Sequence, residues 1–366
     1  MSTPTIVEVE GRKLKLTNLD KILYPKTGFT KGQVVDYYVR IAPVLVPHLA
    51  GRPLTMKRYP GGVGENQEFF FEKNAPKHRP DWVKTAPVWS EGNNRTMYYL
   101  LANDLPTLTW IANLASIELH PSLSLASDIA TPTMIVFDLD PGPPADIVQC
   151  CQVGLWVREI FDHFGLRSFP KTSGSKGMQV YIPLHTKTSY EQTKPFAHAV
   201  ARLLEHTHPD LVVSDMKKAV RTNKVFVDWS QNDQHKTTIS VYSLRAREHP
   251  TVSTPVSWEE VEETLKKKDP KHLVFESNDV LARVEKMGDL FEPVRSLKQK
   301  LPQLEGLGAS DGRPDGGEDS NSVTVRAEER SGVGKRTGKT TGAKAKTKGK
   351  PALKSAASKS TSAKLR

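Results

Sequence analysis

The stretch MIVFDLDPG, residues Met134–Gly142, decides the fold, because it is an apolar run that carries two carboxylates one residue apart. If the run is a strand, alternation sends Asp138 and Asp140 to one face and the large apolar side chains beside them to the other. Two carboxylates on one face of a buried strand repel each other, and a divalent cation between them stabilises them best. The stretch therefore predicts a sheet with an acidic site on one face.

A third carboxylate of the same kind is Asp228, at the end of the apolar segment Lys224–Trp229. Three carboxylates gathered on a sheet are the ligand set of a two-metal phosphoryl-transfer site. A pair of aspartates one residue apart also occurs at ordinary strand ends and turns. The prediction of a metal site therefore depends on the neighbouring segments.

The loop Thr172–Gly177, with the sequence TSGSKG, comes just before a predicted strand at Gln179–Ile182. Its glycines let backbone N–H groups approach an anion, and Lys176 adds a positive charge. The spacing is not that of a P-loop, and an ordinary tight turn is the alternative. Further groups that suit a polyphosphate site, with surface ion pairs as the alternative interpretation, are Arg221, Lys224, Gln231, Lys236, Arg245 and Arg247.

Two other segments are weaker candidates for a site. His120 follows a helical apolar pattern over Asn103–Leu119, and a histidine at a helix end is more often a cap or a core hydrogen-bonding group. Phe69–Phe71 lies shortly after Gly61–Gly64. Its rings either stack on nucleic-acid bases from a loop or belong to the core.

Capping signals predict where several helices begin. Thr30 is expected to cap a helix over Lys31–Leu45, and another helix is expected from about Asp146. Ser257 and Glu260 form a capping box for a later helix. We also expect a strand over residues 238–242.

The composition indicates a globular part with a basic extension. The 366 residues, 37% hydrophobic and 25% charged, are enough for one large domain or two smaller ones. The net charge of +11 comes from Ser331–Arg366, which has 11 Lys and Arg and no acidic residue, leaving 41 basic against 41 acidic residues elsewhere. A segment so poor in apolar residues cannot fold alone. It predicts a disordered arm that contacts nucleic acid, or else an inert solubilising extension.

The cysteine content and the hydropathy indicate the compartment. Cys150 and Cys151 are the two cysteines, and their adjacency indicates neither a disulfide framework nor a zinc site. The chain opens without a signal pattern, and no apolar run reaches the roughly 18 residues of a membrane span. We expect a cytoplasmic, nucleoid-associated protein, without membrane contact and monomeric.

Eight segments, taken in order, resemble the polymerase domain of bacterial ligase D, an archaeo-eukaryotic-type primase-polymerase. The resemblance covers about residues 5–295. There is no Lys-x-Asp-Gly ligase motif, so the chain looks like a stand-alone member, similar to the mycobacterial ligase-C-associated primase-polymerases. The segments are Asn18–Pro25, Gly51–Thr55, Phe70–Lys73, Glu118–Pro121, Phe137–Gly142, Ser173–Gly177, Val227–Asn232 and Ser253–Val256.

This resemblance implies an α+β fold. Its archaeo-eukaryotic primase-like catalytic core has mixed or antiparallel sheets flanked by helices, and a disordered basic C-terminal tail follows. Residues 1–120 are then expected to be an N-terminal α/β part with the DNA-end contacts. Residues 121–300 would be the catalytic core, and residues 301–366 the Lys-rich tail.

The resemblance also implies roles for individual residues. Asp138, Asp140 and Asp228 are expected to be catalytic and to bind two Mn2+ or Mg2+ ions. The NTP or dNTP substrate is expected to contact Lys57, Arg58, His120, Ser173, Lys176, Gln179, Arg221, Gln231 and Arg245. DNA is expected to contact Lys21 and Lys31 through a 5′-phosphate and Phe70 and Phe71 through its bases.

One position departs from the family pattern. Gln179 stands where members commonly have histidine. Glutamine donates and accepts hydrogen bonds but carries no proton at neutral pH. Gln179 therefore cannot act as an acid or a base at neutral pH, while the three carboxylates are unaffected.

The function implied is that of a DNA-directed nucleotidyltransferase, a DNA or RNA polymerase that fills short 5′-phosphorylated gaps or breaks and prefers ribonucleotides. Non-homologous end joining and base excision repair are the pathways expected, with an ATP-dependent DNA ligase and Ku as partners. The alternative is a catalytically weak DNA-end-binding factor that recruits a ligase. Clustered acids near DNA give a pure binder no advantage, which favours the enzyme.

Overall fold

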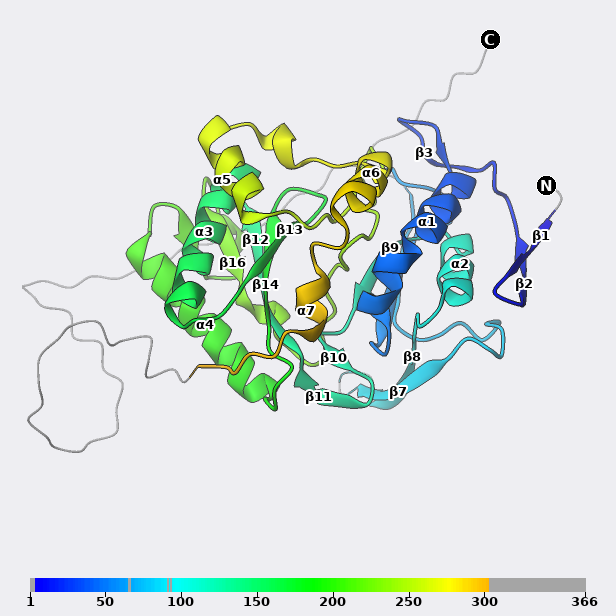
Figure 1. Cartoon of the computed structure of the whole chain (residues 1–366), viewed down its shortest axis with the longest axis horizontal. Coiled ribbons are helices and arrows are strands. Elements are labelled where there is room, and N and C mark those ends of the chain that lie inside the picture. The colour runs from blue at the N-terminus through cyan, green and yellow to red at the C-terminus, as the bar shows by residue number, and fades with distance from the viewer. Residues whose placement is uncertain (1–3, 65–66, 91, 93, 303–366) are drawn as a thin grey trace, which may run out of the picture. The chain divides into compact units, whose positions relative to one another are not determined.

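The Met134–Pro141 run is strand β12, in the middle of a five-stranded mixed sheet (Figure 1). The structure is a computed structural model that describes residues 4–64, 67–90, 92 and 94–302. The strand order is β13–β14–β12–β16–β15, with β12 antiparallel to both of its neighbours. The other strands are β13 (Phe169–Thr172), β14 (Met178–Pro183), β15 (Val212–Val213) and β16 (Val225–Asp228).

Alternation along β12 divides its side chains between two cores, as the sequence predicts. Ile135, Phe137 and Leu139 are fully buried in the cluster that packs on α3 (Ile147–His163) and α4 (Tyr190–Thr207). Val136 belongs to a second apolar cluster on the opposite face. Asp138 and Asp140 continue that opposite face beyond the apolar part of the strand.

A second sheet has the order β6–β5–β8–β7, with β9 also paired to β5. In Figure 1 the long helix α1 and the shorter helix α2 lie close to these strands. Their side chains share one apolar cluster with β5 and β9. The elements are α1 (Lys31–Leu49), β5 (Leu54–Arg58), β6 (Phe70–Glu72), β7 (Thr85–Ser90), β8 (Arg95–Leu100), α2 (Leu105–Asn113) and β9 (Ser116–Pro121).

Two secondary-structure predictions are wrong. The helical pattern over Asn103–Leu119 is cut after α2, where Ala115 has a φ of 57°, and its last part becomes β9 paired with β5. The predicted strand over residues 238–242 does not form. Its backbone instead donates from Thr238 and Ser240 to carbonyls of β9 and then turns at Tyr242, which has a φ of 61°.

The predicted helix starts are confirmed, since Thr30, Asp146 and Ser257 each form a capping box. The remaining elements are smaller and lie around the two sheets. They are β1 (Thr5–Val9), β2 (Arg12–Leu16), β3 (Ile22–Tyr24), β4 (Phe29–Thr30), β10 (Ser124–Leu125), β11 (Asp128–Pro132), η2 (Lys218–Val220), η3 (Trp229–Gln231), α5 (Trp258–Lys267), η4 (Pro270–Leu273), α6 (Ser277–Met287) and α7 (Glu292–Ser296).

Mixed and mostly antiparallel sheets flanked by helices confirm the expected α+β class. The chain divides into two units, residues 1–311 and 312–366, and every described residue lies in the first. The Lys-rich tail predicted over residues 301–366 lies outside the described residues from residue 303 on, and the boundary at residue 120 stays a prediction. None of the helices described is long and apolar enough to cross a membrane.

Candidate functional site

The three predicted carboxylates meet where β12 and β16 pair. Asp138 lies directly opposite Asp228 on β16, and on its other side it lies opposite Gln179 of β14. Gln179 is in turn opposite Lys171 of β13. Directly opposite residues share one face of a sheet, so these four side chains form a row across four strands, with Asp140 one alternation further along β12.

The carboxylates of this row oppose one another electrostatically. Burial, reinforced by the charges of Asp140 and Asp228, raises the pKa of Asp138 to about 7. Burial and the Asp228 charge also raise the pKa of Asp140. Hydrogen bonding by Gln179 and the charge of Lys171 offset only part of the effect on Asp138. The acidic face therefore favours the binding of positive charge.

Asp228 is held in place by its own strand end. Its Oδ1 accepts from the backbone N of Ser230 at 2.9 Å and from the Ser230 hydroxyl at 2.5 Å. Its Oδ2 accepts from Gln231 Nε2 at 2.7 Å. The predicted nucleotide contact Gln231 is thus tied to a predicted metal ligand, and both oxygens of that carboxylate have fixed directions.

Divalent cations fit this donor set. Within residues 4–302, leaving out the gaps named above, no group of three or more His, Cys, Asp or Glu side chains is already arranged to hold an ion. Nevertheless, oxygen donors are the ligands that Mg2+ and Mn2+ prefer. Burial and the charges of neighbouring carboxylates raise the pKa of Asp138 and of Asp140, and a bound cation would offset the part of this effect that comes from charge repulsion. The residues present therefore suit such an ion.

The Thr172–Gly177 loop connects β13 to β14 beside the acidic face. The Ser173 hydroxyl accepts from the backbone N of Ser175 and of Gly177, both at 3.2 Å, which closes the loop. A Cβ on Gly177 would lie 2.0 Å from the Leu139 carbonyl oxygen of β12, so only glycine fits. Lys176 is exposed on this loop, and its charge lowers the pKa of Asp140.

Arg221 lies on the other side of the acidic face. Its guanidinium lies 3.6 Å from the centre of the Phe226 ring and donates from Nη2 to the carbonyl of Met216 at 2.5 Å. Its charge, like that of Lys176, lowers the pKa of Asp140. Arg221 and Lys176 therefore both act on Asp140, one alternation beyond the row along β12.

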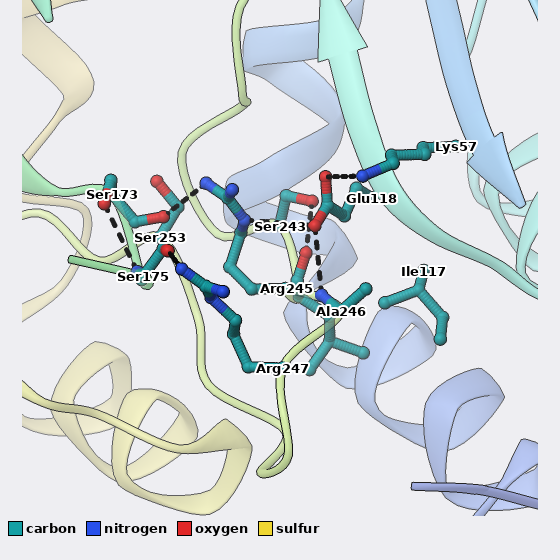
Figure 2. Close-up of polar contacts among 12 residues, drawn as sticks. Lys57, Ile117, Glu118, Ser173, Ser175, Ser243, Arg245, Ala246, Arg247 and Ser253 are labelled. Atoms are coloured by element: carbon teal, nitrogen blue, oxygen red, sulfur yellow. Dashed lines mark hydrogen bonds and ion pairs between the residues drawn. The ribbon is translucent and has the colours of Figure 1, made fainter. Parts of the chain in front are cut away.

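A second group of predicted residues gathers around Glu118 of β9 (Figure 2). Glu118 Oε1 accepts from Arg245 Nε at 3.2 Å, and its Oε2 lies 3.0 Å from His120 Nε2 and 3.9 Å from Lys57 Nζ. Arg245 also donates from Nη1 to the carbonyl of Ser173 at 2.6 Å. This group therefore reaches the loop that borders the acidic face.

The predicted aromatic contacts lie next to this group. Phe70 and Phe71 on β6 are about half exposed, at 51% and 49%. Phe71 meets His120 edge to face, with ring centres 5.7 Å apart. Phe69 stacks on Tyr59, and the ammonium of Lys57 lies 4.4 Å from the centre of the Phe69 ring. Exposed rings beside a cation are suited to stacking on bases.

The residues predicted to bind a DNA end form a separate cluster. Lys31 is buried and donates from Nζ to the Thr17 carbonyl at 2.6 Å, and Lys21 donates to the carbonyl of Pro60. Arg58 belongs with them, because its charge contributes to lowering the pKa of Lys31. Arg58 also pairs with Glu72 at 2.9 Å. Its predicted role with the nucleotide stays a prediction.

Two residues of the site were missed by the sequence interpretation. Lys171 is fully buried and donates to the Ser253 hydroxyl at 2.6 Å, yet nothing in its local sequence marks it as buried. Glu118 lies in the segment Glu118–Pro121, where the resemblance assigns a role to His120 and none to the glutamate. Since its segment is a strand, Glu118 and His120 share one face, which a helical interpretation of that segment concealed.

Comparison with known proteins identifies the family. The model of the LigD primase-polymerase domain matches residues 30–291. The LigD multifunctional non-homologous end joining protein of Mycolicibacterium smegmatis is 43% identical over 284 residues, which are 77% of this chain and 36% of that protein. A bifunctional LigD of Bacillus subtilis is 34% identical over 278 residues, 75% of this chain and 43% of that protein.

A solved structure agrees with these sequence matches. The polymerase domain of Mycobacterium tuberculosis ligase D in complex with DNA matches with a TM-score of 0.71 and 40% identity, covering 78% of this chain and 99% of that one. An acidic sheet face bordered by a small-residue loop and by cations suits phosphoryl-transfer chemistry, and the matching family model is that of a primase-polymerase domain. The chain belongs to the LigD primase-polymerase domain family. It spans a little over a third of the M. smegmatis LigD that it matches.

Proposed function

We propose that the chain is a DNA-directed polymerase of DNA repair that fills short gaps at 5′-phosphorylated gaps or breaks and prefers ribonucleotides. The row from Lys171 to Asp228 carries this proposal, because it combines paired carboxylates with bordering cations. The relatives are named for non-homologous end joining, and the matched structure contains DNA. Non-homologous end joining is therefore the first pathway proposed, with Ku and an ATP-dependent ligase as partners, and base excision repair is the second.

Asp138, Asp140 and Asp228 would hold two divalent cations, Mn2+ or Mg2+. Such ions, when bound, align a primer hydroxyl with the α-phosphate and neutralise charge on the leaving pyrophosphate. The chain's own contribution is orientation. Ser230 and Gln231 fix the Asp228 carboxylate, and the nearby cations Lys176, Arg221 and Arg245 would bind the triphosphate.

The DNA would be held by two groups of residues. Lys21 and Lys31 of the separate cluster would bind the 5′-phosphate on the far side of a gap, and Phe70 and Phe71 beside the Glu118 group would stack on bases. A protein with this cluster alone would bind ends without extending them. This is the second candidate function, a ligase-recruiting factor.

Primer extension on one- to three-nucleotide gaps separates the two functions. Gaps with a 5′-phosphate and with a 5′-hydroxyl are compared, with Mn2+ or Mg2+ and with NTPs or dNTPs. We expect extension by the wild type, fastest with NTPs and a 5′-phosphate. An Asp138→Asn/Asp140→Asn variant should lose several orders of magnitude in rate. The control Asp36→Asn changes an exposed aspartate of α1 that pairs with Arg40 at 3.7 Å, and this variant should extend primers like the wild type. Tight end binding without extension by the wild type would instead favour the recruiting factor.

A further inference from the structure

Glu118 lies buried at the centre of three residues that are predicted to bind the nucleotide, Lys57, His120 and Arg245. Figure 2 shows Lys57 and Arg245 on either side of it. Only 5% of its side chain is exposed, against 23% for Lys57 and 18% for Arg245. Its place on β9 is fixed by register, because Glu118 lies directly opposite Lys57 of β5. The carboxylate is therefore part of the framework of the site.

Both oxygens of Glu118 are fully used. Oε1 accepts from Arg245 Nε at 3.2 Å and from the backbone N of Ala246 at 3.0 Å. Oε2 lies 3.0 Å from His120 Nε2, with the Lys57 ammonium at 3.9 Å. A carboxylate only accepts, so it fixes the imidazole proton on Nε2 and leaves Nδ1 as the acceptor of a neutral ring.

The contacts continue from Glu118 to the Thr172–Gly177 loop. Arg245 is held at one end by Glu118 and at the other by the Ser173 carbonyl, at 2.6 Å. Arg247, two residues further, donates to the Ser175 hydroxyl of the same loop. Figure 2 shows both arginines pointing from their segment toward the loop. Arg245 thus links Glu118 of β9 to the Thr172–Gly177 loop.

A buried negative charge is unfavourable beside a site for polyphosphate, since it repels the ligand. Charge alone therefore does not explain a glutamate in this position. The orientation of Lys57 and Arg245 explains it, because long Lys and Arg side chains lose rotamer freedom when they bind a ligand, and holding them in place beforehand removes that cost.

We propose that Glu118 is a positioning residue of the nucleotide site, which orients Arg245, Lys57 and His120 before the nucleotide binds. The proposal rests on the proposed polymerase function and deepens it. Glu118 touches no reacting atom. It acts through the three side chains that it holds.

Replacing Glu118 separates an effect of orientation from an effect of charge, because the two predict opposite changes in the KM for the nucleotide. Glu118→Gln removes a negative charge, so charge alone predicts a lower KM for the nucleotide. Orientation predicts that KM rises on the order of tenfold to a hundredfold, the equivalent of charge-assisted hydrogen bonds, with a smaller change in kcat. Glu118→Asp keeps the charge, but its side chain is one methylene shorter and cannot hold the three partners in the same way. The orienting role therefore predicts a higher KM for this variant too.

The matched control is Glu260→Gln on α5. Glu260 also pairs with an arginine through both oxygens, Arg283 at 2.7 and 2.9 Å, and it makes no contact with the site residues. The Glu260→Gln variant should leave the KM for the nucleotide unchanged. A second readout needs no activity: nitrogen-detected imidazole NMR of His120 should show the proton on Nε2 in wild type and a loss of that tautomer in Glu118→Gln.

A raised KM in both Glu118 variants, with folded protein by thermal melting and unchanged KM in the control, would support the proposal. An unchanged or lowered KM in Glu118→Gln, with an active wild type, would overturn it and leave the polymerase function intact. Wild-type protein that neither extends a primer nor binds nucleotide would overturn the polymerase function as well. Should Glu118→Gln fail to fold, an unchanged KM in Glu118→Asp would still overturn the positioning role.

Discussion

At the residue scale, Lys31 is a cation whose charge changes within the working pH range. Burial, followed by the charges of Lys21 and Arg58, lowers its pKa to about 8. A phosphate contact needs the protonated amine, so affinity for a 5′-phosphorylated DNA end should fall between pH 7 and pH 9. Titrations with 5′-phosphate and 5′-hydroxyl ends at each pH measure this. Lys31→Arg stays charged and should remove the dependence, and an equal decline in that variant would contradict the assignment.

A second prediction at this scale concerns Asp138, because its ionised form destabilises the folded protein. Its pKa is raised to about 7 in the folded state, so ionisation destabilises the native protein increasingly from about pH 4 to 7. Without metal ions, Asp138→Asn should raise the melting temperature by a few degrees at pH 8 and by less at pH 5. Thermal melts in EDTA test this. If Asp138→Asn melts at a lower temperature than the wild type at pH 8, the ionised Asp138 side chain does not destabilise the folded protein overall.

At the scale of elements, the contact between the Thr172–Gly177 loop and β12 supports the acidic row. Gly177→Ala would force a Cβ against the Leu139 carbonyl and displace β14 from β12. We expect a loss of about 1–3 kcal/mol in the free energy of unfolding and a larger fractional loss in extension rate. Gly92→Ala, where a Cβ meets nothing within 4 Å, is the control. Urea unfolding and gap filling together check the prediction, and a Gly177→Ala protein as stable as the control would refute it.

Local signals explain which elements the sequence predicts well. The capping boxes at Thr30, Asp146 and Ser257 and the alternation of β12 depend on neighbouring residues alone. The switch from α2 to β9 depends on pairing with β5, some sixty positions earlier, so an apolar pattern could not show it. The cluster of Lys57, His120 and Arg245 around Glu118 could not be predicted for the same reason, because the segment of Glu118 was predicted to be helical. Asp138 and Asp140 could be recognised because their alternation on one short strand is itself a local signal.

At the scale of the whole molecule, the balanced globular part and the basic tail should have separable roles. From residue 303 on, the tail lies outside the described residues, and within it residues 331–366 carry 11 positive charges and no acidic residue. Deleting residues 303–366 should weaken DNA binding and flatten the dependence of affinity on salt, while the extension rate at saturating DNA stays within about twofold. Binding isotherms across a salt series measure this, and an unchanged salt slope would assign the tail no part in DNA contact.

The row of Lys171, Gln179, Asp138 and Asp228 also bears on how the chain avoids misfolding. If β12 slipped by one residue against its neighbours, every side chain on it would exchange faces. Asp138 and Asp140 would then enter the apolar layer beneath α3, where an unpaired carboxylate costs several kcal/mol. Shifted pairings are therefore penalised far more heavily than the native one. The acids that cost the correct sheet some stability also protect its register, so a molecule that reaches a stable sheet has its acidic row assembled.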